Sequence, residues 1–433
     1  MKSDGASENT TLWRDLGLNL ERHDKLLAAV DSAYREVYAG QTNRPEGMKY
    51  FDDMLSDLHG GRIRELLEHK KRGGKVVGVF CLFVPEEIIH AAGGIAVKME
   101  GGTQLPISDA ETILPADICP LIKSLTGSKL SKTSPYFELV DFVVGETTCD
   151  AKKKTWEILN NYVPTYVMEL PQKKTQRDRE LWLRELFALK EKMEVESGVK
   201  ITSESLGKSI KIFNSKRKAM NRLHALRRNS PPPISGRDAN LVSQIADYDD
   251  PERFTAKVNN LCDELEKRVK NGQAAVAPGA PRIMITGCPA ALPNWKVHSL
   301  IEGGGAVVVA EDTCLGARYF MDPFIFIEDT ASTVKQIKAL ADRYLNIACP
   351  CFTPSYCGVI QMSETVEDFR PSGVVYYVLQ FCHAFNIEFY KMEKRLKEMG
   401  IPVLKVQTDY AGEDTGQLST RIEAFLERVS SRR

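Results

Sequence analysis

Residues 281–320 constrain the fold of this chain more strongly than any other stretch. Two short apolar runs, at 282–286 and 306–310, are separated by a segment that starts at Pro293 and stops at the glycines 303–305. Apolar runs of about five residues are typical of parallel strands covered on both faces. A proline at the start and glycine at the end are typical of a helix. The stretch therefore predicts a βαβ unit in a parallel sheet.

Cysteines follow both predicted strands within a few residues. Cys288 comes after the first strand, and Cys314 comes after the second. In open parallel sheets the functional crevice lies beyond the carboxyl ends of the strands. We therefore expect both thiols at the edge of the sheet where a site would form.

The same pattern recurs elsewhere in the chain. Residues 75–102 repeat the order strand, cysteine, helix and strand, and 141–171 resembles 373–409. Cys149 and Cys382 occupy matching positions, each after a strand and at the start of a helix. The chain is therefore predicted to be an α/β protein with two related doubly wound parallel-sheet halves, Rossmann-like or flavodoxin-like, and added helical segments.

Amphipathic helical patterns occupy much of the remaining sequence. Apolar residues recur at three- and four-residue spacing in 10–72 and 176–228, and prolines at 231–233 interrupt the second pattern. Amphipathic surface of this length needs burial, so we expect a homodimer. The predicted domains are an N-terminal helical segment, a first α/β domain, a helical connecting segment and a second α/β domain, at 1–72, 73–175, 176–280 and 281–433.

The overall charge excludes some classes of partner. The 58 basic and 58 acidic side chains balance, so no global field favours nucleic acid or a membrane surface. The sequence shows neither a signal peptide nor an apolar run long enough to span a bilayer, which predicts a cytoplasmic location. In that compartment the ten cysteines are expected to be core thiols, metal ligands or redox groups rather than disulfides.

Most cysteines follow a strand or stand beside proline or glycine, where the backbone can turn a side chain into a crevice. Three interpretations stay open at this point: core packing, a zinc site and an iron–sulfur cluster. The chain has no CxxC pair, and only His383 adjoins one of these cysteines, so a catalytic zinc site is the weaker metal hypothesis. Cys262 lies among leucines on a predicted helix and is expected to pack in the core.

Several nucleotide and hydrolase motifs are absent from the sequence. There is no GxxxxGK[ST] phosphate loop, no GxGxxG after a strand and no GxSxG elbow. We therefore expect this chain to bind neither ATP nor a dinucleotide, and to lack a Ser/His/Asp hydrolase site.

An ordered series of motifs resembles one superfamily from about residue 70 to the carboxyl end. The motifs are VFCLFVPEEIIHAAGG, DICPLIKS, TTCDAKKK, ITGCPAALPNWK, EDTCLGARYF and IPVLKVQTDYAGEDTGQLSTRIEAFLE. They resemble subunits of the 2-hydroxyacyl-CoA dehydratases and benzoyl-CoA reductases. Within that superfamily the chain is most similar to the double-cubane cluster proteins, because it also has the N-terminal stretch NRPEGMKYFD and cysteines in both halves.

The resemblance implies a set of cluster ligands. An ordinary dehydratase subunit holds one 4Fe-4S cluster through three cysteines, which match Cys119, Cys149 and Cys382. A double-cubane 8Fe-9S cluster needs about six thiolates. The implied six are Cys119, Cys149, Cys288, Cys314, Cys349 and Cys382. Cys351 is the alternative to Cys349, while Cys81 and Cys357 are expected in the core or behind the ligands.

The resemblance also implies a function. A separate homodimeric iron–sulfur ATPase would pass low-potential electrons to the cluster, and this chain would reduce a small molecule. The alternatives are a 2-hydroxyacyl-CoA dehydratase subunit with one 4Fe-4S cluster and a non-catalytic cluster carrier. Polar residues near the cysteines could donate protons or hold substrate; these candidates are Glu86, His90, Lys123, Arg318 and His383.

Overall fold

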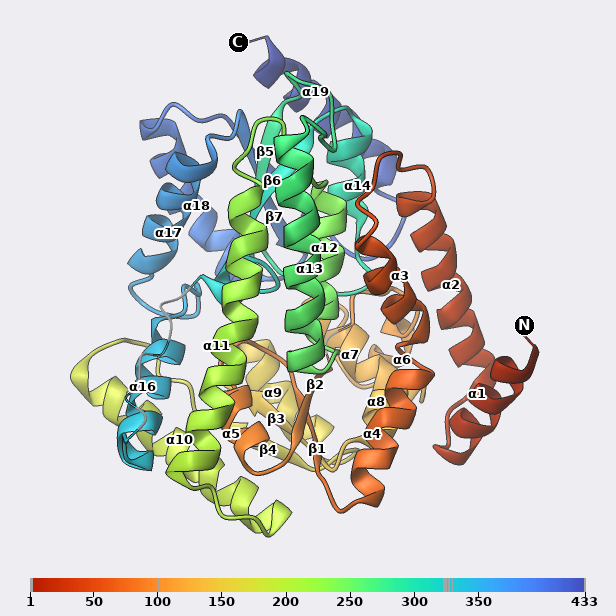
Figure 1. Ribbon diagram of the computed structural model, residues 1–433, viewed down its shortest axis with the longest axis vertical. Coiled ribbons are helices and arrows are strands. Elements are labelled where there is room, and N and C mark those ends of the chain that lie inside the picture. The colour runs from red at the N-terminus through yellow and green to blue at the C-terminus, as the bar shows by residue number, and fades with distance from the viewer. Residues whose placement is uncertain (1–2, 100, 322–324, 326–327, 329, 432–433) are drawn as a thin grey trace. The chain divides into compact units, whose positions relative to one another are not determined.

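The computed structural model describes residues 3–99, 101–321, 325, 328 and 330–431 (Figure 1). The chain forms two compact units, each assembled from separated segments. The first unit comprises Met1–Ser32, Met54–Asn214 and Pro323–Asn346, and the second comprises Ala33–Asp53, Ser215–Asp322 and Ile347–Arg433. The linear division into four domains stays a prediction.

The first unit contains a parallel sheet with the strand order β2-β1-β3-β4. Its strands are β1 Val76–Val79, β2 Ile95–Lys98, β3 Phe142–Glu146 and β4 Thr165–Met168. The two central strands, β1 and β3, are buried along their whole length. Both strands contain consecutive valines, which suit a pleated surface covered on both faces.

Helices pack around this sheet. Helix α9 contacts β3 and β4, α5 contacts β2, and α10 packs against both α5 and α16 (Figure 1). Trp182 of α10 is fully buried and lies edge-on to Phe83, which fixes α10 against the segment after β1. The helices of this unit are α1 Ser3–Asp15, α4 Gly61–Lys71, α5 Glu86–Ala91, α6 Ile107–Ala110, α7 Pro120–Leu130, α8 Pro135–Leu139, α9 Asp150–Leu159, α10 Gln176–Ser197 and α16 Thr333–Asn346.

The second unit contains a parallel sheet with the order β6-β5-β7-β8. Its strands are β5 Arg282–Gly287, β6 Val307–Asp312, β7 Gly373–Leu379 and β8 Val403–Thr408. In each unit the chain order of the strands across the sheet is second, first, third, fourth. This confirms the predicted pair of related parallel-sheet halves. In both sheets the order reverses between the first and third strands, where doubly wound folds place their sites.

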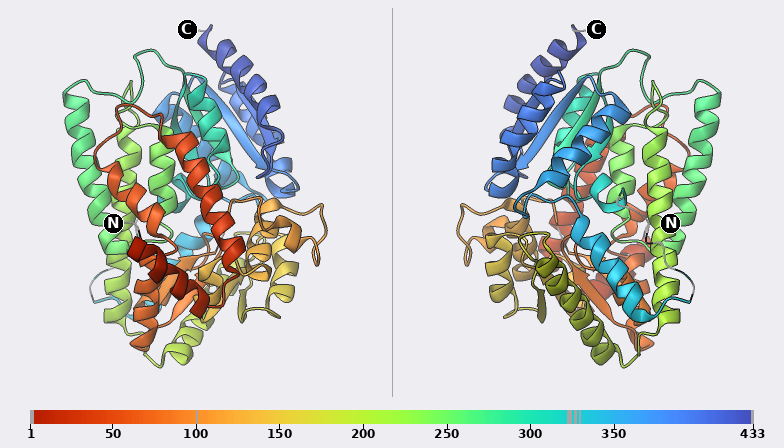
Figure 2. Two further views of the ribbon diagram at one scale, coloured as in Figure 1. Left: turned by 90° about the vertical axis from the view of Figure 1, so that its right-hand side faces the viewer. Right: turned by 90° about the vertical axis from the view of Figure 1, so that its left-hand side faces the viewer.

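Two groups of helices pack on the second sheet. Helices α17 and α18 contact each other and β6 or β7, whereas α14 contacts α12, α19 and β6. Figure 2 shows α19 running beside the blue strands of this sheet. The helices are α12 Gly236–Ile245, α13 Pro251–Lys270, α14 Lys296–Gly303, α15 Ala317–Phe320, α17 Tyr356–Phe369, α18 His383–Glu398 and α19 Thr415–Ser430. Helices α2 Leu20–Tyr38, α3 Met48–Asp57 and α11 Ser203–Leu226 contribute residues to both units.

The crossover helix α14 begins later than the sequence predicts. It starts at Lys296, three residues after the expected start at Pro293. Asn294 holds the intervening turn, because its backbone N–H donates to Ala291 over 2.7 Å and its side chain donates to the Tyr377 hydroxyl over 2.8 Å. None of the helices in the described residues is long and apolar enough to span a bilayer.

Gly287 ends β5 in a conformation that only glycine adopts readily. Its φ is +128°, and a Cβ at this position would lie 2.0 Å from the Tyr377 carbonyl oxygen on β7. We expect Gly287→Ala to reduce the free energy of unfolding by about 2 kcal/mol or more, because the two central strands must separate. The urea midpoint measures this loss.

Gly303→Ala is the matched control for Gly287→Ala. A Cβ at Gly303 meets no other atom within 4 Å, and the residue lies in α14, where alanine is favoured. Equal midpoints for the two variants would contradict the close approach of β5 and β7.

Candidate functional site

Thiols gather along one edge of the second unit's sheet, where the carboxyl ends of its strands lie; we call this the carboxyl edge. Cys288 follows β5, Cys314 follows β6 and Cys382 follows β7. Cys288 is 1% exposed, and its sulfur accepts a hydrogen bond from the Leu379 N–H over 3.4 Å. Because Leu379 is the last residue of β7, Cys288 lies beside the strand that leads to Cys382.

The CxC pair contributes two further thiols to the second unit. Cys349 and Cys351 lie in the segment before α17, and the Cys351 thiol is close enough to Cys349 to interact with it. That contact and burial raise the pKa of Cys349 well above its ordinary value, while the positive charge of Arg318 opposes the shift. Cys349 therefore keeps its proton to a higher pH than an exposed cysteine does.

Arg318 is fixed beside these thiols by a buried carboxylate. Its Nε and Nη2 donate to the two oxygens of Asp312, each over 2.9 Å, and both side chains are almost fully buried. Asp312 also accepts from Thr286 over 2.7 Å and from Gln361 over 3.3 Å. Burial opposes the charge on Arg318, yet Asp312 and then Cys314 raise its pKa above the ordinary value. The guanidinium is therefore a permanent cation at the carboxyl edge.

A buried carboxyl group lies on the same side of the sheet. Glu388 of α18 is 7% exposed, and burial raises its pKa, although Ser355 and Arg318 oppose the shift. The Phe385 ring, one turn earlier on α18, lies 5.1 Å from the Arg318 guanidinium carbon. Glu388 Oε1 is buried and has no hydrogen-bond partner within the described part of the chain. A proton is therefore held at Glu388 to higher pH than at an exposed glutamate.

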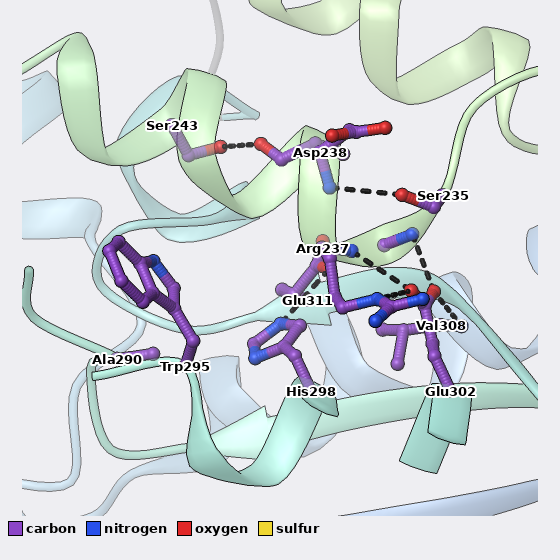
Figure 3. A network of polar contacts seen from close by, with 12 residues as sticks. Ser235, Arg237, Asp238, Ser243, Ala290, Trp295, His298, Glu302, Val308 and Glu311 are labelled. Carbon is purple, nitrogen blue, oxygen red and sulfur yellow. Dashed lines mark hydrogen bonds and ion pairs between the residues drawn. The ribbon is translucent and has the colours of Figure 1, made fainter. Parts of the chain in front are cut away.

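The opposite face of β6 carries a second buried carboxylate. Glu311 precedes Asp312 and points to the other face, because side chains alternate along a strand. It accepts from Arg227 Nη2 over 2.7 Å, and His298 Nε2 of α14 lies 3.4 Å from its Oε1 (Figure 3). Burial opposes ionisation, but the charges of Arg227 and His298 lower the pKa of Glu311 to about 2. The end of β6 is thus held by an arginine on each face.

A neighbouring set of polar contacts holds α12 to α14 and β6. Arg237 Nε donates to Glu302 over 2.9 Å, and Glu302 also accepts from the Val308 N–H over 3.1 Å (Figure 3). Gln244 accepts from the Trp295 indole over 2.7 Å and donates to the Ala290 carbonyl over 2.6 Å. These contacts fix the loop that begins at Cys288.

Two thiols of the first unit lie at helix starts. Cys119 is the N-cap residue of α7 and Cys149 that of α9, just as Cys382 is the N-cap residue of α18. N-caps are usually serine, threonine, aspartate or asparagine, and a thiol is a weak acceptor, so helix capping does not explain these cysteines. Backbone N–H groups and the positive dipole end at a helix start stabilise thiolates instead.

The remaining cysteines differ in their surroundings. Cys262 on α13 is fully buried, as the sequence predicts, and burial raises its pKa to about 12. Cys81 is half-buried, and its N–H donates to Glu146 over 3.2 Å. Cys357 is exposed rather than in the core, because it lies in the first turn of α17 while Gly358 faces Met392 of α18.

The other polar candidates are placed as follows. Lys123 donates to Glu111 and to the Ala116 carbonyl, each over 2.7 Å, which is a structural arrangement. His90 Nδ1 lies 2.7 Å from the Ser209 hydroxyl. Glu86 begins α5, and His383 is exposed at the start of α18. Arg318 is close enough to Cys314 and Cys349 to interact electrostatically with both.

The thiols of the second unit are of the donor type that holds iron–sulfur clusters. Among the described residues, no three His, Cys, Asp or Glu side chains lie so that they could hold one metal ion. Thiolates of a cluster bind different irons and therefore lie farther apart than the ligands of one zinc ion. The donors are soft sulfurs, and the buried Arg318 Nη1 beside them has no partner in the described residues. The residues present fit a cluster.

Sequence reasoning missed several residues of this edge. Asp312 could have been found, because a carboxylate at the end of an apolar strand is unusual and must be paired. Gln361 and Glu388 carry no such signal, since they lie on amphipathic helices and reach the site only through the packing of α17 on α18.

Acid should destabilise the protein in two steps. Burial lowers the pKa of His224 to about 3 and that of His59 to about 3, so between pH 6.5 and 3 the unfolded chain binds more protons than the folded one. Over most of that window, each histidine lowers the free energy of unfolding by about 1.4 kcal/mol for each pH unit of acidification. Because the pKa of Glu311 is lowered, its protonation reduces the free energy of unfolding further between about pH 4.5 and 2.

Urea midpoints at pH 7, 5.5 and 4.5 measure the histidine contribution. His224→Leu keeps an apolar side chain beside Phe320 and Phe369 and should flatten the pH dependence. The same dependence in wild type and variant would show that burial of neutral His224 is not its source.

Comparison with known proteins identifies the family. Residues 81–429 match the family described as 2-hydroxyglutaryl-CoA dehydratase, D-component. The chain is 35% identical to a provisionally named dehydratase subunit, YjiM, of Escherichia coli (strain K12), over 87% of this chain and 97% of that protein. It is 25% identical to the (R)-phenyllactyl-CoA dehydratase beta subunit of Clostridium sporogenes, over 88% and 99%.

A reductase subunit is also among the relatives. The chain is 26% identical to one of the benzoyl-CoA reductase subunits of Thauera aromatica, over 79% of this chain and 87% of that protein. Both dehydratase and reductase subunits therefore share most of this sequence. The chain belongs to the 2-hydroxyacyl-CoA dehydratase family, as a subunit of the dehydratase and benzoyl-CoA reductase type.

Proposed function

We propose that this chain is an iron–sulfur oxidoreductase that carries a double-cubane cluster and reduces a small molecule. Its low-potential electrons would come from a separate, homodimeric, ATP-hydrolysing iron–sulfur protein. When bound, the cluster supplies electron storage and a site for reduction at low potential.

The number of thiols at the second unit's carboxyl edge carries this proposal. By resemblance, one 4Fe-4S cluster needs only Cys119, Cys149 and Cys382. Cys288 and Cys314 follow strands at the same edge as Cys382, and Cys349 interacts with the same arginine as Cys314. This unit therefore offers enough sulfur ligands for a second cubane, with Cys349 preferred and Cys351 as its alternative.

The chain's own side chains would prepare the site. Asp312 holds the Arg318 cation beside the thiols, and the helix start at Cys382 directs backbone N–H groups toward the same edge. Burial raises the pKa of Glu388, which makes this residue a candidate proton donor to a reduced substrate. Close packing around Cys288 would exclude water from the sulfur.

A division of labour with partners follows from the sequence. The chain lacks a phosphate-loop motif, so we assign ATP hydrolysis to a separate protein. Some relatives are named as beta subunits, which supports assembly with another chain, and we propose a homodimer in the cytoplasm. The substrate class is a small unsaturated or nitrogenous molecule.

A dehydratase is the second candidate function. The relatives include an (R)-phenyllactyl-CoA dehydratase subunit and a lactoyl-CoA dehydratase subunit that align over most of this chain. In that case one 4Fe-4S cluster on Cys119, Cys149 and Cys382 would suffice. A cluster carrier without turnover is a third possibility, and it would lose its iron to an acceptor protein.

Iron and acid-labile sulfide should be measured on protein purified without oxygen. We expect about eight irons per chain for the double cubane, whereas about four would favour the dehydratase. Near-zero iron after anaerobic reconstitution would refute both cluster hypotheses and favour core packing as the role of the cysteines.

Alanine substitutions separate the two cluster types. Cys149→Ala and Cys382→Ala should lose most iron under either hypothesis. Cys314→Ala should lower iron and sulfide only if a second cubane is present, because the single-cubane set does not use it. Cys262→Ala is the matched control, because this thiol is buried on α13 and belongs to neither set of proposed ligands. Full iron in Cys314→Ala would contradict the double cubane.

A further inference from the structure

Arg318 has a donor nitrogen that the polypeptide does not use. Asp312 takes the edge of the guanidinium formed by Nε and Nη2. The remaining nitrogen, Nη1, is buried and has no hydrogen-bond partner among the residues that the structure describes. A buried N–H without an acceptor is costly, and it leaves Nη1 able to donate to a group that is not part of the chain.

The guanidinium has little freedom to turn elsewhere. Its carboxylate partner is itself held by Thr286 and Gln361, and the Phe385 ring covers the guanidinium at 5.1 Å. In a side-on pair with a carboxylate, the third nitrogen points away from the carboxylate. Asp312 therefore orients Nη1 as well as neutralising the cation.

Two thiols are among the groups that interact with Arg318, beside Glu388 and Tyr376. The charge of Arg318 acts on Cys314 and on Cys349, which come from the segment after β6 and the segment before α17. The comparable buried arginine, Arg227, instead faces Glu311 and His224 on the other side of β6. The two pairs thus share their chemistry but differ in what surrounds them.

We propose that Arg318 Nη1 donates hydrogen bonds to sulfur, thiolate or sulfide, of the group held by the second unit's cysteines, and that it positions this group and raises its reduction potential. Hydrogen bonds to sulfur and nearby positive charge both stabilise the reduced form. Arg318 is then a positioning residue rather than a catalytic one. This inference rests on the proposed function.

The test compares two neutralised pairs in the full-length protein, purified without oxygen. Arg318→Gln combined with Asp312→Asn removes the guanidinium, with its Nη1, and both charges, so no uncompensated carboxylate stays buried. Arg227→Gln combined with Glu311→Gln makes the same change on the other face of β6. Iron content, circular dichroism and the midpoint potential, titrated by electron paramagnetic resonance, are the readouts. Arg318→Lys retains a cation beside Asp312 without the planar third nitrogen.

We expect the Arg318 pair to show a more negative midpoint potential, with Arg318→Lys intermediate and the Arg227 pair at the wild-type value. Loss of iron from a folded Arg318 pair while the Arg227 pair keeps its iron also supports a positioning role. Unchanged iron and potential, or equal losses in both pairs, would overturn the inference. Wild-type protein that never holds iron would instead refute the proposed function itself.

Discussion

Two adjacent buried carboxylates at the end of β6 determine how the second unit is built. Glu311 and Asp312 point to opposite faces of the sheet, and each is neutralised by its own buried arginine, Arg227 or Arg318. Removing one partner of such a pair costs about 3–5 kcal/mol, because a charge is left in the interior. The strand end, the segment carrying Cys314 and the packing of α17 therefore depend on the same few charges.

The sequence predicts the fold well because the relevant signals are local. Valine-rich runs that end at glycine or at a cysteine identify the strands, and the repeated pattern gives two halves with one strand order. Boundaries set by side-chain contacts are less predictable. The start of α14 depends on Asn294 contacting Tyr377, which is far away in the sequence. The compact units likewise join separated segments through contacts that no local pattern encodes.

In the candidate site, too, local features can be predicted from sequence, whereas contacts between distant residues cannot. Cysteines that follow strands can be recognised from the sequence. Arg318 is a candidate by the same reasoning, because it lies four residues after Cys314 in the sequence. Gln361, which donates to the carboxylate partner of Arg318, and the buried Glu388 come from α17 and α18. Lys123, although close to Cys119 in sequence, is used to bind Glu111 and the Ala116 carbonyl. Proximity along the chain therefore indicates a site only when the fold turns the side chain toward it.

The closeness of Cys349 and Cys351 makes these two thiols susceptible to oxidation. After one of these neighbouring thiols is oxidised to a sulfenic acid, the other can attack it and release water. Air would then convert the CxC pair into a disulfide, in which neither sulfur is a thiolate. A thiol reductant would be needed to restore the two thiols.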